Sequence, residues 1–131
     1  MTRYLADTFA LIEALAGHPR YSRIAASKAI VTTALNVLEL HYALLRSRLS
    51  TAEAEHASRA ALNLVVEVPP DVAMSAARTR LAVNERLARA KDKARMSYID
   101  AWGYEAARAL GLPFLTGDPV FRRMAGVEFV R

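Results

Sequence analysis

The segment MSYIDAWGYEAARALGLPFLTGD, residues 96–118, decides how the chain folds. Ser97 suits a helix N-cap and is followed three residues later by Asp100, which is the spacing of a capping box. Gly111 and Pro113 are typical of the end of a helix. The apolar run that follows is too short for another helix, so it predicts a buried strand that ends before Asp118. The segment therefore predicts a helix, a turn, a strand and an acid at the strand's carboxyl end.

The same alternation of short apolar strands and longer helices extends over the whole chain. Strands are predicted at residues 3–6, 29–32, 64–68, 112–115 and 127–130. Helices are predicted at residues 8–16, 21–27, 34–49, 50–61, 71–93 and 97–110, with a short one from residue 119. Apolar strands that alternate with helices are typical of a parallel sheet covered on both faces. We therefore predict one α/β domain over residues 1–131, built as a three-layer α/β/α sandwich.

Two of the predicted helices carry distinct faces. The apolar stripe of helix 34–49 consists of Leu35, Leu38, Tyr42, Leu45 and Leu49, and Glu39 lies near its edge. One face of helix 71–93, with Asp71 as its predicted cap, carries Met74, Ala77, Leu81 and Ala88. Another face of that helix is a basic stripe of Arg78, Arg86, Arg89 and Lys93. Such a stripe is usually a solvated helix face, although it would also suit contact with an RNA backbone.

The composition limits the possible functions. Hydrophobic residues make up 53% of the 131 residues, which suits a domain with a real core rather than a disordered chain. The absence of cysteine excludes disulfides and thiolate zinc sites, and agrees with a cytoplasmic location. We expect neither a signal peptide, since Asp7 interrupts the first apolar run, nor a membrane helix. The net charge of +5 favours a polyanionic partner such as nucleic acid.

Four acids from separate parts of the chain are predicted to meet at one edge of the sheet. Asp7 and Asp118 each follow a strand, Glu39 lies in the helix after the second strand, and Asp100 begins the helix that leads into the fourth. The carboxyl ends of parallel strands share one edge, which is where ligands bind in such sheets. Any one of these aspartates alone would equally suit a helix cap. Helix capping alone does not account for four acids at the same edge of the sheet.

Carboxylates that gather in this way repel one another unless a cation lies between them. Oxygen ligands from several elements suit Mg²⁺ or Mn²⁺ rather than zinc. Such an ion can bind a phosphate and activate a water molecule as a nucleophile. The pattern therefore predicts metal-dependent hydrolysis of phosphodiester bonds, with Asp7, Glu39, Asp100 and Asp118 as the metal-binding and catalytic residues.

The segments that carry these acids resemble those of PIN domains, and most of all the single-domain VapC-type toxins of prokaryotic toxin–antitoxin pairs. The four segments are LADTFALI (5–12), TALNVLEL (33–40), DAWGYEAA (100–107) and LTGDPVF (115–121). They occur in the family's order and span essentially the whole chain. The match between residues 50 and 95 lies only in the pattern of elements, so it carries no information on substrate choice.

The resemblance implies a five-stranded parallel sheet in the order 3-2-1-4-5 and an acidic cleft for Mg²⁺ or Mn²⁺. It also implies endoribonuclease activity, a homodimer, and a cognate antitoxin that blocks the cleft. The family's acids correspond to Asp7, Glu39, Asp100 and Asp118, its helper hydroxyl corresponds to Thr116, and Thr8 would have a similar supporting part. Gly117 stands where the family commonly has a larger residue, and we expect this departure to loosen the loop.

Two other functions remain open at this stage. One is a non-catalytic PIN-like module that binds RNA or a protein partner, which the presence of all four acids opposes. The other is a phosphoacceptor receiver domain, which would need paired acids after the first strand and a lysine late in the chain. Asp7 has no acidic neighbour and no lysine follows Lys93, so this function fits poorly.

Overall fold

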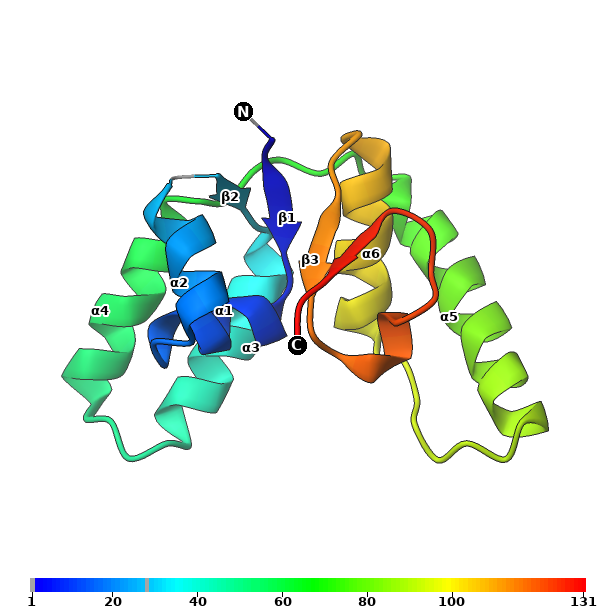
Figure 1. Ribbon diagram of the computed structural model, residues 1–131, viewed down its shortest axis with the longest axis horizontal. Coiled ribbons are helices and arrows are strands. Elements are labelled where there is room, and N and C mark those ends of the chain that lie inside the picture. Colours follow the sequence, from blue (N-terminus) through cyan, green and yellow to red (C-terminus); the bar gives the residue numbers. More distant parts are fainter. Residues whose placement is uncertain (1, 28) are drawn as a thin grey trace.

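A computed structural model describes residues 2–27 and 29–131 and shows a parallel sheet between two layers of helices (Figure 1). The strands are β1 (Tyr4–Ala6), β2 (Ile30–Val31), β3 (Phe114–Thr116) and β4 (Val127–Phe129). The helices are α1 (Thr8–Leu15), α2 (Pro19–Ala26), α3 (Ala34–Leu45), α4 (Thr51–Leu62), α5 (Val72–Arg89) and α6 (Tyr98–Ala109), with a 3₁₀ helix η1 (Pro119–Phe121). The predicted α/β/α sandwich is confirmed.

The sheet has the order β2-β1-β3-β4 and all its pairings are parallel. The segment predicted as strand 64–68 lies beside β2, but a single parallel bridge between Thr32 and Val65 joins it to the sheet. The order 3-2-1-4-5 is therefore kept, although its first member is much shorter than predicted. This segment lies at the sheet's edge and runs directly into Pro69 and Pro70, which have no N–H group to continue a ladder.

Alternate residues of each strand enter separate cores. Leu5, Val31 and Phe114 pack against α5 and α6, where Phe114, Tyr104 and Phe121 form an aromatic group with ring centroids 4.9–5.9 Å apart. Each strand also has a neighbouring residue that faces the opposite core, formed with α1, α2, α3 and α4. These residues are Ala6, Ile30 and Leu115. The period of two along every strand thus produces the two covered faces.

The buried face of α3 differs from the predicted stripe. Val37, Leu40 and Leu44 enter the core, whereas the members of the predicted stripe are 37–59% exposed: Leu35, Leu38, Tyr42, Leu45 and Leu49. Because α3 is apolar on most sides, its sequence allows two stripes. Thr33 caps the helix and the buried Asn36 is bonded within its first turn, so these contacts select which stripe faces the sheet.

Helix α5 is shorter than predicted and Asp71 makes no side-chain cap bond. Val72, Ala76 and Val83 form its buried face, while Met74 and Leu81 of the other apolar row are 66% and 62% exposed. In Figure 1 this helix stands apart from the opposite helical layer, so that α5 on one side and α3 with α4 on the other border a concave side of the molecule.

Candidate active site at the carboxyl edge of the sheet

All four predicted acids lie around the carboxyl edge of the sheet. Asp7 directly follows β1, Asp118 lies two residues after the end of β3, and their side chains cap α1 and η1. Asp100 lies in the first turn of α6, which runs back from this edge into β3. Glu39 lies in the second turn of α3, the helix that follows β2. The parallel topology therefore brings residues from four separate segments to one edge.

Asp7 is the most buried of these acids, with 3% of its surface exposed. One carboxylate oxygen accepts a hydrogen bond from the Ala10 N–H (2.8 Å), and the other accepts one from the Thr116 hydroxyl. Burial is the main cause that raises the pKa of Asp7 to about 7; the charges of Asp100 and Asp118 contribute in the same direction, and the two hydrogen bonds oppose the rise. A proton or a cation is therefore favoured at this carboxylate near neutral pH.

Asp100 is the second acid whose titration is altered. Its side chain accepts a bond from the Ser97 N–H (2.9 Å) and its own N–H donates to the Ser97 hydroxyl (3.0 Å), which is the predicted capping box. Burial raises the pKa of Asp100, the bonds from Ser97 oppose this, and the charges of Asp118 and Glu39 raise it again. Glu39 is thus near enough for its charge to act on Asp100.

Thr116 joins two of the acids. Its hydroxyl donates to the Asp7 carboxylate and accepts a bond from the Asp118 N–H (3.0 Å). The Asp118 carboxylate in turn accepts from the Val120 N–H (3.0 Å), at the first turn of η1. The Thr116 hydroxyl at the end of β3 therefore holds the Asp7 carboxylate, which follows the neighbouring strand β1.

The carboxylates are close enough to repel one another, yet they do not form a compact ligand group in this conformation. Within residues 2–27 and 29–131, no three acidic or histidine side chains lie together closely enough to hold an ion. Three of the acids instead accept bonds from backbone N–H groups of Ala10, Ser97 and Val120. Those bonds turn the oxygens toward the helix ends on which they lie.

Comparisons with known proteins agree with this geometry. The sequence profile of the PIN domain matches residues 4–127. The chain belongs to the PIN domain family. PIN domains are generally nucleases. A search of curated proteins finds none that matches this sequence.

Solved structures of similar shape share the PIN fold at low sequence identity. One is PAE2754 from Pyrobaculum aerophilum (21% identity, 98% of this chain and 91% of that chain covered, TM-score 0.69). A second is VapBC2 from Rickettsia felis, bound to a DNA fragment from its promoter (14% identity, 98% of each chain, TM-score 0.70). A third is VapBC-5 from Mycobacterium tuberculosis (21% identity, 100% and 99% covered, TM-score 0.65).

The buried side-chain amide of Asn36, which the sequence analysis missed, supports the site of this PIN domain. The Asn36 side chain donates to the Thr8 hydroxyl (3.3 Å) and accepts from the Thr33 hydroxyl (2.7 Å). The Thr8 hydroxyl donates in turn to the Asn36 carbonyl oxygen (3.3 Å), so it does not bond to a carboxylate as Thr116 does. Asn36 thereby ties the helix that Asp7 caps to the helix that carries Glu39. Its signal in the sequence is a single polar residue in the otherwise apolar first turn of α3.

Gly117 packs tightly, contrary to the expectation that it loosens the loop. A Cβ atom at this position would lie 2.5 Å from the Val130 carbonyl oxygen, 2.5 Å from the Phe9 ring and 2.6 Å from the Tyr21 hydroxyl. The Tyr21 hydroxyl also donates to that same carbonyl oxygen. A larger residue would therefore force the loop before Asp118 away from the chain's last strand.

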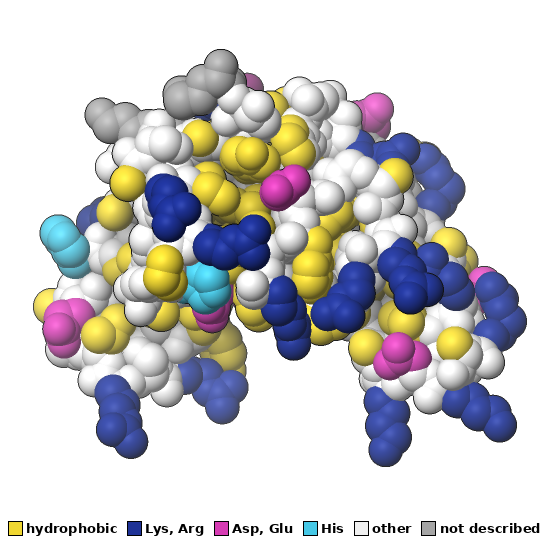
Figure 2. All heavy atoms as spheres, viewed as in Figure 1, with side chains coloured by type: hydrophobic (Ala, Val, Ile, Leu, Met, Phe, Trp, Pro, Cys, Tyr) yellow, Lys and Arg dark blue, Asp and Glu magenta, His cyan; other side chains and the backbone are white. Residues whose placement is uncertain are grey.

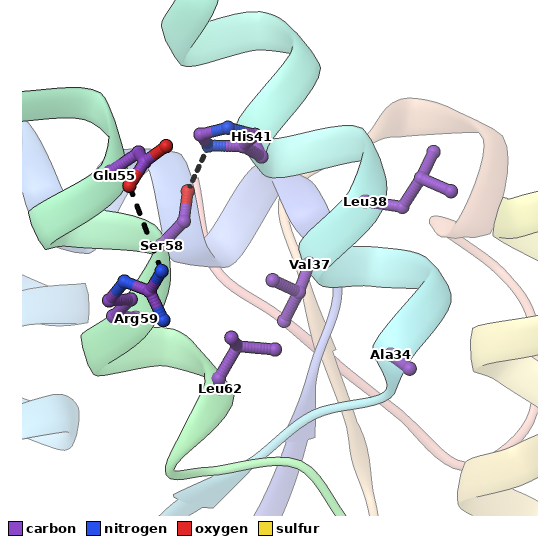
Figure 3. Close-up of a pocket in the computed structure, with 8 residues that line it drawn as sticks. All are labelled: Ala34, Val37, Leu38, His41, Glu55, Ser58, Arg59 and Leu62. Atoms are coloured by element: carbon purple, nitrogen blue, oxygen red, sulfur yellow. Dashed lines mark hydrogen bonds and ion pairs between the residues drawn. The ribbon is translucent and has the colours of Figure 1, made fainter. Parts of the chain in front are cut away.

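A well-formed pocket of this PIN domain lies away from the acids. A pocket of about 350 Å³ lies between α3 and α4, and its residues are labelled in Figure 3. His41 and Ser58 face each other across it at 2.7 Å, Glu55 and Arg59 pair beside them at 3.8 Å, and Leu38 points away toward the other side of α3. None of the four acids lines this pocket. The candidate site is an open edge and not a closed cavity.

Lys and Arg outnumber Asp and Glu among the charged side chains on the visible face of the domain (Figure 2). Figure 2 shows Lys and Arg side chains over both helical layers and along the margin of the concave side. The basic stripe Arg78, Arg86, Arg89 and Lys93 is exposed, as predicted for a solvated face. In the part of the chain that the structure describes, no helix has the length and hydropathy needed to cross a membrane.

Proposed function

We propose that this PIN domain is a metal-dependent endoribonuclease and the toxin of a VapBC-type toxin–antitoxin pair, acting in the cytoplasm. The observation that carries the proposal is the mutual influence of Asp7, Asp100 and Asp118, with Asp7 buried and its pKa raised to about 7. A chain gains nothing in stability from such an arrangement, because each charge raises the free energy of the others. A bound cation would convert that cost into binding energy.

The residues present fit a hard divalent cation, Mg²⁺ or Mn²⁺. The donor set of Asp7, Glu39, Asp100 and Asp118 offers carboxylate oxygens only, which is the ligand chemistry of these ions. Asp100 and Asp118 would turn away from the backbone N–H groups that they now cap. Each such cap bond is worth about 1 kcal/mol, which is small beside the attraction of several carboxylates for one divalent ion.

The protein's own groups would prepare the site for RNA. Thr116 holds one Asp7 oxygen in place, so that this carboxylate meets the substrate in a fixed orientation. The capping box keeps Asp100 at the end of α6. A bound ion would polarise the phosphate and lower the pKa of a water molecule. The arginines around the concave side would attract the RNA backbone.

The alternative is a PIN-like module that binds RNA or a protein without cleaving. The presence of all four acids speaks against it, because a binding module for a polyanion has no use for buried negative charge. The receiver-domain function is set aside, since the family match covers residues 4–127.

The proposed role brings two protein partners. Two of the structural neighbours are described as VapBC bound to DNA, one of them to a fragment from its promoter, and we propose a cognate antitoxin for this chain by analogy. We also propose a homodimer. The exposed residues Leu35, Leu38, Tyr42 and Leu45 form a row of large apolar side chains on α3, with Leu49 just beyond the end of the helix, and such rows mark protein interfaces.

The test is cleavage of single-stranded RNA by the purified chain with Mg²⁺, Mn²⁺ or a chelator. Wild type is expected to cleave only with an added ion, and Asp7→Asn and Asp100→Asn to lose cleavage while they stay folded. Asp71→Asn, an exposed acid far along the sequence from the four, is the matched control and should cleave as wild type does. Cleavage that survives both substitutions would refute the proposed site, and persistence in chelator would refute metal dependence.

A further inference from the structure

An exposed tyrosine lies at the first position of the helix that carries Asp100. Tyr98 is 72% exposed, the highest value among the large apolar and aromatic side chains of the described chain. The guanidinium carbon of Arg80, from α5, lies 4.0 Å from the centre of its ring. One cation can cover only one face of a ring, and the high exposure shows that the rest of the ring meets solvent.

The pairing holds the ring without burying it. An arginine at this distance from a tyrosine ring makes a cation–π contact, which restrains the ring's orientation. The Nε atom of Arg80 is buried and has no hydrogen-bond partner among the described residues. Arg80 therefore keeps its position beside the ring although one of its hydrogen-bond donors has no partner. An unsatisfied buried donor raises the free energy of the folded state, so stability alone does not explain this position.

The approach to this helix is also fixed. The Asn84 side chain, one turn beyond Arg80 on α5, donates to the Met96 carbonyl oxygen (3.1 Å) and accepts from the Met96 N–H (2.7 Å). Tyr98 follows two residues later and Asp100 two residues after that, which is a rise of about 3 Å along a helix. Two positions also correspond to a rotation of about 200° around the helix axis, so the ring and the carboxylate lie at the same end of α6 but on different sides of it.

We propose that Tyr98, held by Arg80, is a stacking platform for a base of the bound RNA where the RNA passes the start of α6. This inference rests on the proposed ribonuclease function and adds a binding residue to it. Stacking on an aromatic ring stabilises an unpaired base without a requirement for its sequence, and a neighbouring guanidinium favours the adjacent phosphate. A nucleic acid fits this surface better than an apolar protein does, because the segment that leads to Tyr98 exposes Lys93 and Arg95.

The experiment measures affinity for RNA in the full chain made inactive by Asp7→Asn, without added metal. The probes are a fluorescent single-stranded RNA of mixed sequence and the same oligonucleotide with abasic positions. Tyr98→Leu is expected to weaken binding of the normal RNA roughly tenfold and to leave binding of the abasic RNA unchanged. Tyr98→Phe, which keeps the ring, should restore the lost affinity.

The arginine has a separate expected effect. Arg80→Ala should weaken binding and also reduce its dependence on salt, because a charge is lost, whereas Tyr98→Leu should leave the salt dependence as it was. Arg59→Ala, which removes an exposed arginine of α4 that is paired with Glu55, is the charge-matched control and should alter affinity less than Arg80→Ala.

Three outcomes would overturn the platform. The first is that Tyr98→Leu binds the normal RNA as tightly as its parent, and the second is that it loses affinity for both probes equally. The third is that Tyr98→Leu changes the oligomeric state without changing RNA affinity, which would mark a protein interface. If wild type cleaves RNA with Mn²⁺ and any of these is seen, only the platform fails. If wild type neither cleaves nor binds RNA, the proposed function fails and the platform fails with it.

Discussion

The Thr116 hydroxyl donates a hydrogen bond to the Asp7 carboxylate, although 109 positions separate the two residues in the sequence. The contact exists because β1 and β3 are neighbours in the sheet, with Ala6 opposite Leu115. The same hydroxyl accepts from the Asp118 N–H. One small polar group therefore sets the orientation of one acid and the backbone position of another, at the junction of the two central strands.

We expect Thr116→Val to lower the cleavage rate about 10- to 100-fold, because a hydrogen bond to a charged group is worth about 1.5–3 kcal/mol. Valine has nearly the same shape and is compatible with a strand, so the fold should persist. Thr116→Ser keeps the hydroxyl and should recover most of the rate. Steady-state cleavage of a labelled RNA measures both variants, and equal rates for valine and serine would show that the hydroxyl has no part in the reaction.

The raised pKa of Asp7 predicts how stability depends on pH in the absence of metal. The unfolded chain loses this proton near its ordinary pKa of 3.8, whereas the folded protein keeps it until about 7. The free energy of unfolding should therefore fall as pH rises through this range. Asp7→Asn removes this loss and should be more stable than wild type at neutral pH, by on the order of 2–4 kcal/mol.

Urea unfolding at several pH values in chelator tests this effect, with Asp71→Asn as a control that leaves the slope unchanged. Addition of Mn²⁺ should stabilise wild type above pH 7 and leave Asp7→Asn unaffected, because the ion competes with the proton for the same oxygens. A wild-type stability that rises with pH between 4 and 7 and matches that of Asp7→Asn would contradict the burial argument.

Gly117→Ala should destabilise the protein by about 1–3 kcal/mol, the usual cost of overpacking. The new Cβ would meet the Val130 carbonyl oxygen, a backbone atom that cannot rotate away. Relief of this contact would displace the loop before Asp118, so the cleavage rate should fall as well. Thermal unfolding and cleavage assays measure the two effects.

Gly111→Ala is the matched control for this substitution. Gly111 has a positive φ of 68° and no atom within 4 Å of an added Cβ, so alanine there strains only the backbone at the end of α6. It should lower stability and leave cleavage almost unchanged. A Gly117→Ala variant with wild-type stability would show that the loop is loose after all.

The exposed stripe of α3 predicts a dimer that one charge can break. Leu45→Lys places a cation where two copies would bury a leucine that is 48% exposed in one chain. Light scattering after size exclusion should give a dimer for wild type and a monomer for Leu45→Lys. Leu62→Lys, on α4 and 49% exposed, is the control and should stay dimeric. A monomeric wild type at high concentration would remove the dimer from the proposal.

Local signals predicted much of the fold correctly. The capping box at Ser97 and the left-handed Gly111 lie where the sequence places them. Each depends on residues within one turn of each other, so neighbouring sequence suffices to define it. The predictions of the buried face of α3, the extent of strand 64–68 and the extent of helix 71–93 were wrong, because each depends on what packs against the segment.

The sequence by itself determined the alternation of strands and helices and the position of each acid relative to its own element, since these follow from side-chain period and backbone caps. Only the tertiary structure decided which stripe of α3 is buried, that Gly117 is tightly enclosed, and that Thr116 holds Asp7. Those facts depend on the pairing of β1 with β3 and on the packing of helices across the sheet. Contacts of this kind join residues far apart in the chain, and no local pattern encodes the distance between them.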